Sequence, residues 1–384
     1  MNSADMVLEL IKSVITDTPV APVLDTEPLD YKAIFHIAKA HDLTALVSQG
    51  LYQNGLFPQG EMGNHFKMSQ IATLGRGTQL DSERDLVCRA LTEANIQYVL
   101  LKGSVLKDFY PESYLRTQCD IDILVRKDAL SQAKDLFMTQ LDFVHVETSN
   151  HDVAFMTPRG IRIELHYALL EEQNEQTDAV LATAWDHVTF REDNHCHGEF
   201  SWEFFVFYHI SHMEKHFLHG GCGVKPLIDL WMLHHKIGFD IKKAEALFAQ
   251  CGLVTFYRES MHLCEVWFGT APHTKLTRAM EDYIFGAGVY GALENEVAIS
   301  QIKRGGRWGH LLHKIFLDYS TMKIYYPSLA RVPFLFPFYQ VVRWMRLVFT
   351  DERKRVAYEI NTNQTVSEEK RREVAYLCKK LDIM

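Results

Sequence analysis

The chain has 384 residues, of which 47% are hydrophobic and 23% charged, a balance that excludes wholesale disorder and predicts two or three packed units. The formal net charge of −9 argues against a protein that coats nucleic acid, because such proteins carry a basic surface. The seven cysteines are scattered and form no Cys-x-x-Cys pair, so neither a disulfide framework nor a cysteine zinc site is predicted.

Neither end of the chain carries a targeting or membrane-spanning signal. The first residues lack the basic start and the long apolar stretch of a secretory signal. The longest uncharged apolar run near the other end, 332–342, is short and is interrupted by Pro333 and Pro337. We therefore expect a cytoplasmic protein without a transmembrane segment.

The first hundred residues are expected to be helical. Apolar residues recur at nearly helical spacing in 31–51, and good helix formers fill 64–94. Turn signals at Asn54-Gly55 and at 58–60 separate the two segments.

Short strands are expected in the centre of the chain, from about residue 95 to 170. Continuous or alternating apolar runs predict strands at 98–101, 119–125, 143–147, 153–156 and 161–167, with an amphipathic helix at 127–140. These elements together predict a small α+β unit.

Helical spacing returns at about residue 200 and continues to the end. It predicts helices at 201–217, 225–237, 241–249, 277–285, 338–349 and 367–381. The predicted fold class is therefore α+β, with a small mixed β-sheet unit flanked by a helical amino-terminal section and a larger helical carboxy-terminal section. The predicted limits are 1–94, 95–198, 199–350 and a charged helical tail at 351–384.

Two aspartates share one face of the predicted strand 119–125. Ile121, Ile123 and Val125 alternate with Asp120 and Asp122, so the isoleucines and the valine face the core and both carboxylates project together. Two carboxylates this close repel each other unless a cation lies between them, and Mg²⁺ prefers oxygen ligands. The pair therefore predicts a magnesium site.

A later strand supplies a third carboxylate. Glu164 and His166 share the polar face of 161–166, so Glu164 would join Asp120 and Asp122 if the two strands are neighbours. Three carboxylates can hold two divalent ions, which clamp the attacking and leaving oxygens of a phosphoryl or nucleotidyl transfer. The alternatives are an exposed Glu164 paired with Arg162, and a His166 that only forms a hydrogen bond at the edge of the cleft.

A glycine–serine turn lies upstream of the acidic pair. Gly103 and Ser104 follow a predicted strand and open a helix, where backbone N–H groups and a hydroxyl can bind a phosphate. Lys102 and Lys107 add positive charge nearby, and Arg116 is a further candidate for phosphate binding.

The order of these motifs resembles the nucleotidyltransferase fold of the DNA polymerase β-like superfamily. The segment LLKGSVLKDFYPESYLRTQCDIDILV is similar to the pattern LLKG, YP, R and DIDLLV of an uncharacterised bacterial nucleotidyltransferase family. The resemblance spans about 30–350 and is strongest in 97–126. The positions that match the pattern are Lys102, Gly103, Tyr110, Pro111, Arg116, Asp120 and Asp122.

The resemblance implies transfer of a nucleoside monophosphate from a nucleoside triphosphate to an unknown acceptor, with release of pyrophosphate. Asp120, Asp122 and Glu164 would be catalytic and would hold two Mg²⁺ ions, for which Mn²⁺ can substitute. The groups expected to bind the nucleotide phosphates are Lys102, Gly103, Ser104 and Arg116.

The family also has a helix with spaced histidines, followed by a basic residue and an aspartate. Lys225, where arginine is more usual, and Asp229 match that pattern, and together with His166 they are candidates for substrate contact. Histidines at 209, 212, 216 and 219 fall at helical spacing. A zinc site is conceivable there, but we favour hydrogen bonds where this helix meets the catalytic unit.

The segment 302–350 is unusually basic and aromatic. It holds eight Lys and Arg residues and one acidic residue, so its charge is +7 and the rest of the chain carries −16. A wall for an anionic substrate, a nucleic-acid contact, a membrane-surface helix and a helical core element with snorkelling basic residues all remain open.

Two further functions stay open for the whole chain. One is a catalytically silent nucleotide-binding or scaffold protein of the same fold, and the other is an RNA-terminal nucleotidyltransferase. The overall acidity favours a small molecule or a protein over RNA as the acceptor.

Overall fold

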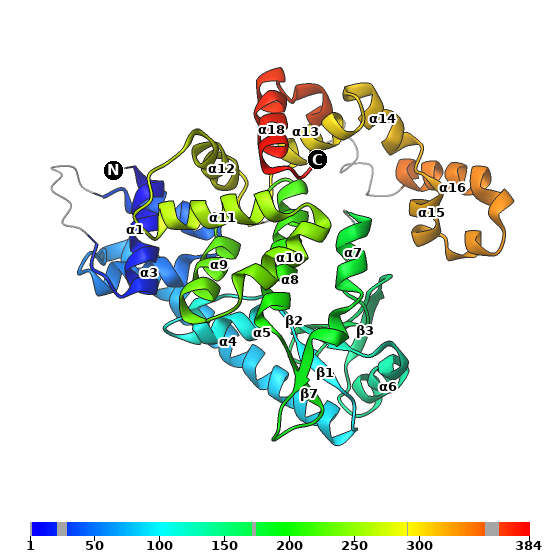
Figure 1. The fold of residues 1–384 in the computed structure, drawn as a ribbon, viewed down its shortest axis with the longest axis horizontal. Helices are drawn as coiled ribbons and strands as arrows, with labels where there is room; N and C mark the ends of the chain where they lie inside the picture. The colour runs from blue at the N-terminus through cyan, green and yellow to red at the C-terminus, as the bar shows by residue number, and fades with distance from the viewer. Residues whose placement is uncertain (1, 21–28, 171–173, 290, 350–360) are drawn as a thin grey trace.

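The structure, a computed structural model, describes residues 2–20, 29–170, 174–289, 291–349 and 361–384 (Figure 1). Its amino-terminal part is helical, as expected. The helices are α1 (Ser3–Thr16), α2 (Tyr31–Ala40), α3 (Thr44–Gln53) and the long α4 (Gly60–Glu93). The segment 31–51 was predicted as one helix, but it divides into α2 and α3 because Asp42 adopts φ 55°, a left-handed conformation that a right-handed helix cannot contain.

A seven-stranded mixed sheet follows α4. The strands are β1 (Tyr98–Leu100), β2 (Asp120–Val125), β3 (Val144–Thr148), β4 (Asp152–Met156), β5 (Arg162–His166), β6 (Val188–Phe190) and β7 (His197–Phe200). Their order is β3-β4-β5-β2-β1-β7-β6. The central strand β2 is parallel to β5 and antiparallel to β1. The sequence did not predict β6 and β7, which are short and carry polar residues such as His197 and Glu199.

The two faces of this sheet pack against different parts of the chain. Ile121 and Ile123 belong to a hydrophobic cluster with the second half of α4 and with α6 (Leu130–Thr139). Val99 and Leu124 project from the opposite face and belong to the main core of the helical body. Because Asp120 and Asp122 alternate with the isoleucines, their side chains lie on the face that meets the helical body.

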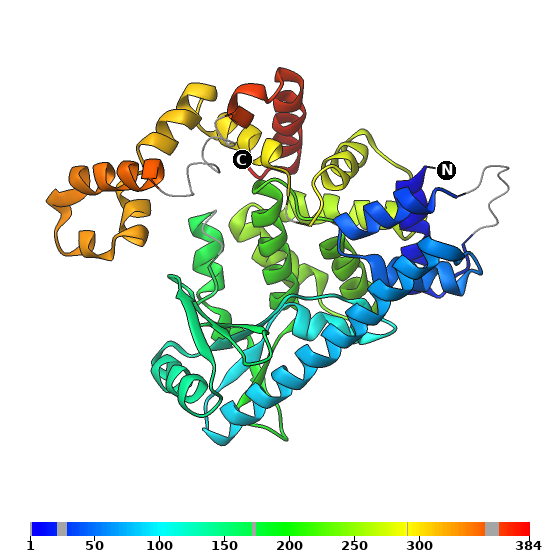
Figure 2. The same ribbon diagram turned by 180° about the vertical axis from the view of Figure 1, so that it is seen from behind.

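The helices after the sheet form most of this body. They are α7 (Glu175–Leu181), α8 (Trp202–Leu218), α9 (Lys225–Lys236), α10 (Ile241–Cys251), α11 (Val254–Trp267), α12 (Lys275–Phe285), α13 (Leu293–Lys303) and α18 (Glu368–Leu381). Their buried residues share one cluster with α1 and α3, so the amino-terminal helices and these helices pack together (Figure 2).

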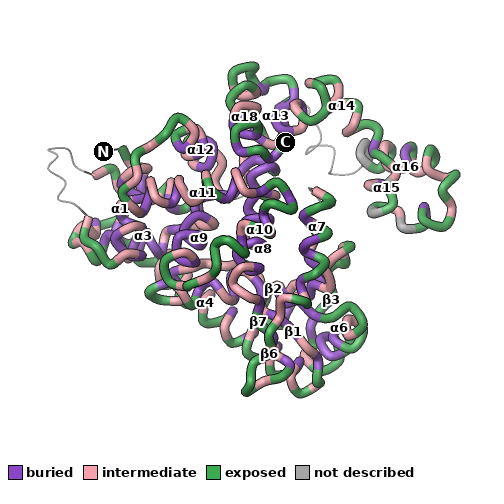
Figure 3. Tube along the Cα trace, in the orientation of Figure 1, coloured by how far each residue is buried: buried purple, intermediate pink, exposed green. Residues whose placement is uncertain are grey.

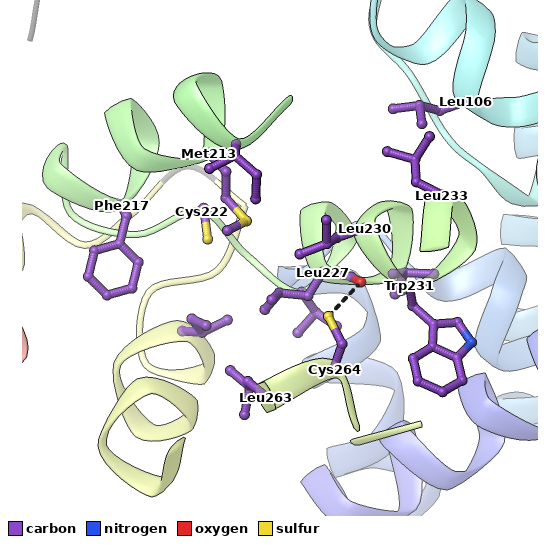
Figure 4. Packing of buried hydrophobic residues seen from close by; sticks show 14 of the residues in the cluster. Leu106, Met213, Phe217, Cys222, Leu227, Leu230, Trp231, Leu233, Leu263 and Cys264 are labelled. Atoms are coloured by element: carbon purple, nitrogen blue, oxygen red, sulfur yellow. Dashed lines mark hydrogen bonds between the residues drawn. The ribbon is translucent and has the colours of Figure 1, made fainter. Parts of the chain in front are cut away.

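The core of this body reaches the turn that follows β1. Figure 4 shows Leu106, in the short helix α5 (Gly103–Leu106), directed toward Leu233 of α9. On the far side of α9, the Cys264 thiol of α11 donates a hydrogen bond to the Leu227 carbonyl at 3.2 Å. Packing of α9 therefore fixes the position of α5 relative to the helical body.

A separate arm projects from the body and contains α14 (Arg307–Ile315), α15 (Tyr319–Tyr325) and α16 (Phe336–Phe349) (Figure 1). A small cluster of its own, with Leu317, Met322 and Leu329 buried, holds the arm together. The described 3₁₀ turns are 107–109, 113–115, 127–129, 184–187, 327–330 and 333–335.

The predicted α+β class, with a mixed sheet between helical sections, is confirmed. The limits predicted for the individual domains stay a prediction. None of the helices in the described ranges combines the length and the apolar character needed to cross a bilayer.

Candidate active site

The acidic residues of β2 and β5 lie side by side. The two strands are hydrogen-bonded neighbours, as the proposed cluster requires, and their register places Asp122 opposite Glu164 and Leu124 opposite His166. Asp122 is only 5% exposed, whereas Asp120 and Glu164 are partly open to solvent. The pairing of parallel strands therefore brings two carboxylates from segments 42 residues apart to one place on the sheet.

Asp122 is at the centre of the polar contacts. Its Oδ1 accepts a hydrogen bond from Lys102 Nζ at 3.2 Å and lies 2.9 Å from His166 Nε2. His166 Nε2 is also 3.8 Å from Glu164 Oε2. Glu164 accepts a hydrogen bond from Arg162 Nε at 2.8 Å, so the predicted Arg162 pair exists together with the cluster and does not replace it.

The charges in this cluster oppose one another. Burial raises the pKa of Asp120 to about 6, and the neighbouring Asp122 carboxylate adds to that rise. Burial would also raise the pKa of Asp122, but the Lys102 ammonium and the His166 hydrogen bond hold it well below its usual range. The site therefore concentrates negative charge on the buried Asp122 and resists a second charge on Asp120.

The donor set fits a divalent cation. Asp122, Glu164 and His166 each offer one ligand atom, and these three atoms lie within 4.8 Å of one another. Carboxylate oxygens suit Mg²⁺ and Mn²⁺, and an imidazole nitrogen suits first-row transition ions. A cation here would offset the repulsion from Asp122, which adds to the effect of burial on the pKa of Asp120.

The turn after β1 is strained and lies beside Asp122. The Leu101 N–H donates to the Asp122 carbonyl at 3.1 Å, and Lys102 then adopts φ 43° and ψ −116°, a conformation that favours glycine. The Ser104 hydroxyl is buried and has no hydrogen-bond partner among the described residues. A Cβ on Gly103 would come within 2.4 Å of Arg116 Nη1 and Gln118 Oε1, so only glycine fits here without displacing them.

Arg116 connects this turn to the helical body. Its Nε and Nη2 donate to the two carboxylate oxygens of Asp229 at 3.0 and 2.8 Å. The Tyr110 hydroxyl also donates to Asp229, at 2.8 Å. Burial would raise the pKa of Asp229, but the Arg116 guanidinium lowers it below its ordinary value. Arg116, expected to bind nucleotide phosphates, and Asp229, expected to contact substrate, thus form an ion pair with each other. Their contacts with a nucleotide or substrate stay a prediction.

Lys225 connects three parts of the chain at the start of α9. Its Nζ donates to Asp42 Oδ2 at 2.6 Å and to the Thr117 carbonyl at 3.2 Å. Thr117 in turn donates its hydroxyl to Asp42 Oδ2 at 2.6 Å. Lys225 therefore joins the amino-terminal helices to the loop that leads into β2, and its predicted contact with substrate remains untested.

A cavity of about 320 Å³ adjoins the turn, between α4 and the loop before β2. Arg116 and Gln118, whose side chains lie against Gly103, form part of its wall. Other lining residues are Asp42, Arg76, Asp81, Lys107, Tyr114, Thr117 and Cys119. The cavity is lined neither by the turn residues 102–104 nor by the acidic residues of β2 and β5, so it reaches the turn only through the side chains of Arg116 and Gln118.

The histidines of α8, and His219 directly after it, form contacts of their own. His209 Nε2 lies 2.9 Å from the Pro226 carbonyl, His212 and His216 approach each other at 2.9 Å, and His219 lies 2.7 Å from the Lys215 carbonyl. Of the described His, Cys, Asp and Glu residues, the group with metal-ligand spacing is the one on β2 and β5. The interpretation as hydrogen-bonding histidines therefore suits this helix better than a zinc site.

Two polar residues of the site, His166 and Gln118, were not among the metal ligands or phosphate-binding residues expected from the sequence. His166 offers a ligand atom beside two carboxylates, and its place two residues after Glu164 was the available signal. Gln118 has its Oε1 buried without a hydrogen-bond partner among the described residues. Gln118 precedes Asp120 by two residues, the spacing that places side chains on one face of a strand.

Replacing Asp229 tests the connection between the turn and the helical body. Asp229→Asn removes the charge that balances the buried Arg116, and we expect the free energy of unfolding to fall by about 3 kcal/mol. Urea denaturation followed by circular dichroism measures this change. The matched control is Asp135→Asn on α6. Because the carboxylate of Asp135 is exposed, this substitution should change the free energy of unfolding by less than about 0.5 kcal/mol. Equal losses in the two variants would contradict the assigned role.

Replacing Lys102 tests the strain at the turn. Lys102→Gly and Lys102→Ala both remove the ammonium, but only glycine relieves the unfavourable φ. We expect the glycine variant to be more stable than the alanine variant by about 1 to 2 kcal/mol in chemical denaturation. At an ordinary helical position, the alanine variant would instead be the more stable of the two, by up to about 1 kcal/mol. An alanine variant at least as stable as the glycine variant would show that position 102 is not strained.

Comparison with known proteins agrees with these features. A family model described as an uncharacterised nucleotidyltransferase matches residues 27–269, more than half of the chain. The matched region runs from before α2 to the end of α11 and contains the whole sheet and the acidic cluster. No curated protein and no solved structure matches. The resemblance found in the sequence is thereby confirmed over residues 27–269, and the chain belongs to this uncharacterised nucleotidyltransferase family.

Proposed function

We propose that the chain transfers a nucleoside monophosphate from a nucleoside triphosphate to an acceptor hydroxyl, in a reaction that requires a divalent metal. In this reaction the acceptor oxygen bonds to the α-phosphorus, the bond from that phosphorus to the bridging oxygen breaks, and pyrophosphate leaves. The observation that carries the proposal is the pairing of Asp122 with Glu164 on adjacent parallel strands, beside a glycine–serine turn.

The residues that would hold the metal are Asp122 and Glu164 with His166, while Asp120 completes the acidic face. When bound, Mg²⁺ or Mn²⁺ would supply positive charge to the phosphate oxygens. The cluster would also accept the proton of the acceptor hydroxyl, a role open to Asp120 and Glu164, which are both partly exposed. This proposal keeps all three sequence-predicted acidic residues in one reaction.

The turn is the proposed site for the triphosphate. The Ser104 hydroxyl, which is buried and has no hydrogen-bond partner among the described residues, is the candidate donor to a phosphate oxygen, while the Arg116 and Gln118 side chains cover Gly103. The Lys102 ammonium, which forms an ion pair with Asp122, would offset the negative charge that develops on the phosphates during the reaction. Arg116 supports the turn through its Nη1, which lies against Gly103.

A catalytically silent nucleotide-binding protein is the second candidate. It is favoured by the contact of Lys102 with Asp122, because an ammonium already neutralises part of the charge that a metal would meet. The two candidates differ in one measurable respect, which is pyrophosphate release. Magnesium-dependent binding of a triphosphate without turnover would favour the silent protein.

Replacing Asp122 tests the proposal. Asp122→Asn keeps the size of the side chain but removes its charge, so turnover should fall by about a thousandfold or more while the fold is retained. The substrates are labelled nucleoside triphosphates with Mg²⁺ and a cell extract, and mass spectrometry identifies the labelled acceptor. Thermal melting monitored by circular dichroism checks the fold.

The matched control is Asp128→Asn, which removes an exposed carboxylate just after β2 and should leave turnover unchanged. If Asp122→Asn retains the activity of the control variant, the proposed mechanism is wrong. Label on RNA, abolished by the same substitution, would identify the chain as an RNA-terminal transferase.

A further inference from the structure

The arm formed by α14, α15 and α16 leaves apolar side chains uncovered. It projects from the body in both ribbon views, and its own core is small (Figures 1 and 2). Much of its trace is exposed or only partly buried (Figure 3). Trp308 is 77% exposed and Phe334 is 79% exposed, values unusual for residues with such large apolar surfaces. The proposed nucleotidyl transfer makes no use of this surface.

The uncovered residues of α14 form a stripe. Trp308, Leu312 and Ile315 are spaced four and three residues apart, so they lie on one face of the helix, and all three are exposed. His310, on another face, is buried and lies 2.6 Å from the Ser300 hydroxyl of α13. The helix is therefore attached to the body by one face while its apolar stripe stays open.

A second stripe lies on α16. Phe338, Val341 and Met345 are exposed and recur at helical spacing. A different face of α16 contacts the end of α14, because Trp344 Nε1 donates to the Ile315 carbonyl at 2.6 Å. The two stripes thus belong to helices that are held together, and this contact uses the backbone carbonyl of Ile315 rather than the exposed side chains of the stripes.

The charge of the arm is opposite to that of the body. The segment 302–350 carries +7, while the remaining residues carry −16. Arg307, Lys323 and Arg331 are exposed on the arm, and Arg304 is exposed just before it, at the end of α13. A basic helix with an uncovered apolar face is the composition of helices that lie in a membrane interface. The net positive charge complements anionic lipid headgroups.

The aliphatic residues favour a lipid surface over RNA. Single-stranded nucleic acid is bound by aromatic rings that stack on bases, and Leu312, Ile315 and Val341 cannot stack. Aliphatic side chains do gain free energy by leaving water for the boundary between headgroups and acyl chains. Binding of this kind requires no helix that crosses the bilayer.

We propose that the arm binds the surface of membranes that contain anionic lipids. The stripes of α14 and α16 enter the interface, and the basic residues contact the lipid phosphates. The acidic body remains in water, since its charge is repelled by the same surface. The inference does not depend on the proposed nucleotidyl transfer.

Sedimentation of the full chain with vesicles tests this inference. We expect binding to vesicles of equimolar phosphatidylglycerol and phosphatidylcholine, at least about tenfold weaker binding to phosphatidylcholine alone, and loss of binding as salt is raised. The double variants Leu312→Gln with Ile315→Gln, and Val341→Gln with Met345→Gln, should each weaken binding to the anionic vesicles by about tenfold or more.

The matched control replaces two exposed apolar residues of α4, Ile71→Gln with Leu74→Gln, and should bind vesicles like the original chain. Circular dichroism melting confirms that each variant is folded. Three outcomes would overturn the proposal. They are vesicle binding that the arm variants do not weaken, binding to single-stranded RNA but not to vesicles, and a dimer in light scattering that the arm variants convert to monomer.

Discussion

The pairing of β2 with β5 is the constraint on which the candidate site depends. Parallel pairing in this register places Asp122 opposite Glu164, and a shift by one residue would turn one of the two carboxylates into the hydrophobic core. The apolar residues of both strands prevent such a shift, because Ile121 and Ile163 are fully buried on the other face. The packing of the core thus determines the geometry of the acidic cluster.

Carboxylates brought together in this way need positive charge, and the structure provides it from a strained turn. Lys102 reaches Asp122 from a backbone conformation that glycine would adopt more easily, so the ammonium is held there against a local cost. Arg116 supports the same turn, while its own charge is balanced by Asp229 of α9. The helical body and the sheet are therefore connected through the residues that surround the site.

Some of the architecture was predictable because it depends on local patterns. Alternation of apolar and charged residues identified β2 and β5, helical spacing identified α8 and α9, and a high content of good helix formers identified α4. The break between α2 and α3 was missed because it depends on a single left-handed residue, Asp42. Strands β6, at the edge of the sheet, and β7, between β6 and β1, were missed because such short strands are specified by their neighbours and not by their own composition.

The amino-acid sequence by itself determined the α+β class, the family and the candidate acidic residues, since these follow from residue order and side-chain periodicity. Only the tertiary structure decided that Glu164 and His166 meet Asp122, that Arg116 binds Asp229, and that Lys225 binds Asp42. It also decided which apolar residues of the arm stay uncovered. These contacts join segments far apart in the chain, and their geometry depends on how strands pair and helices pack.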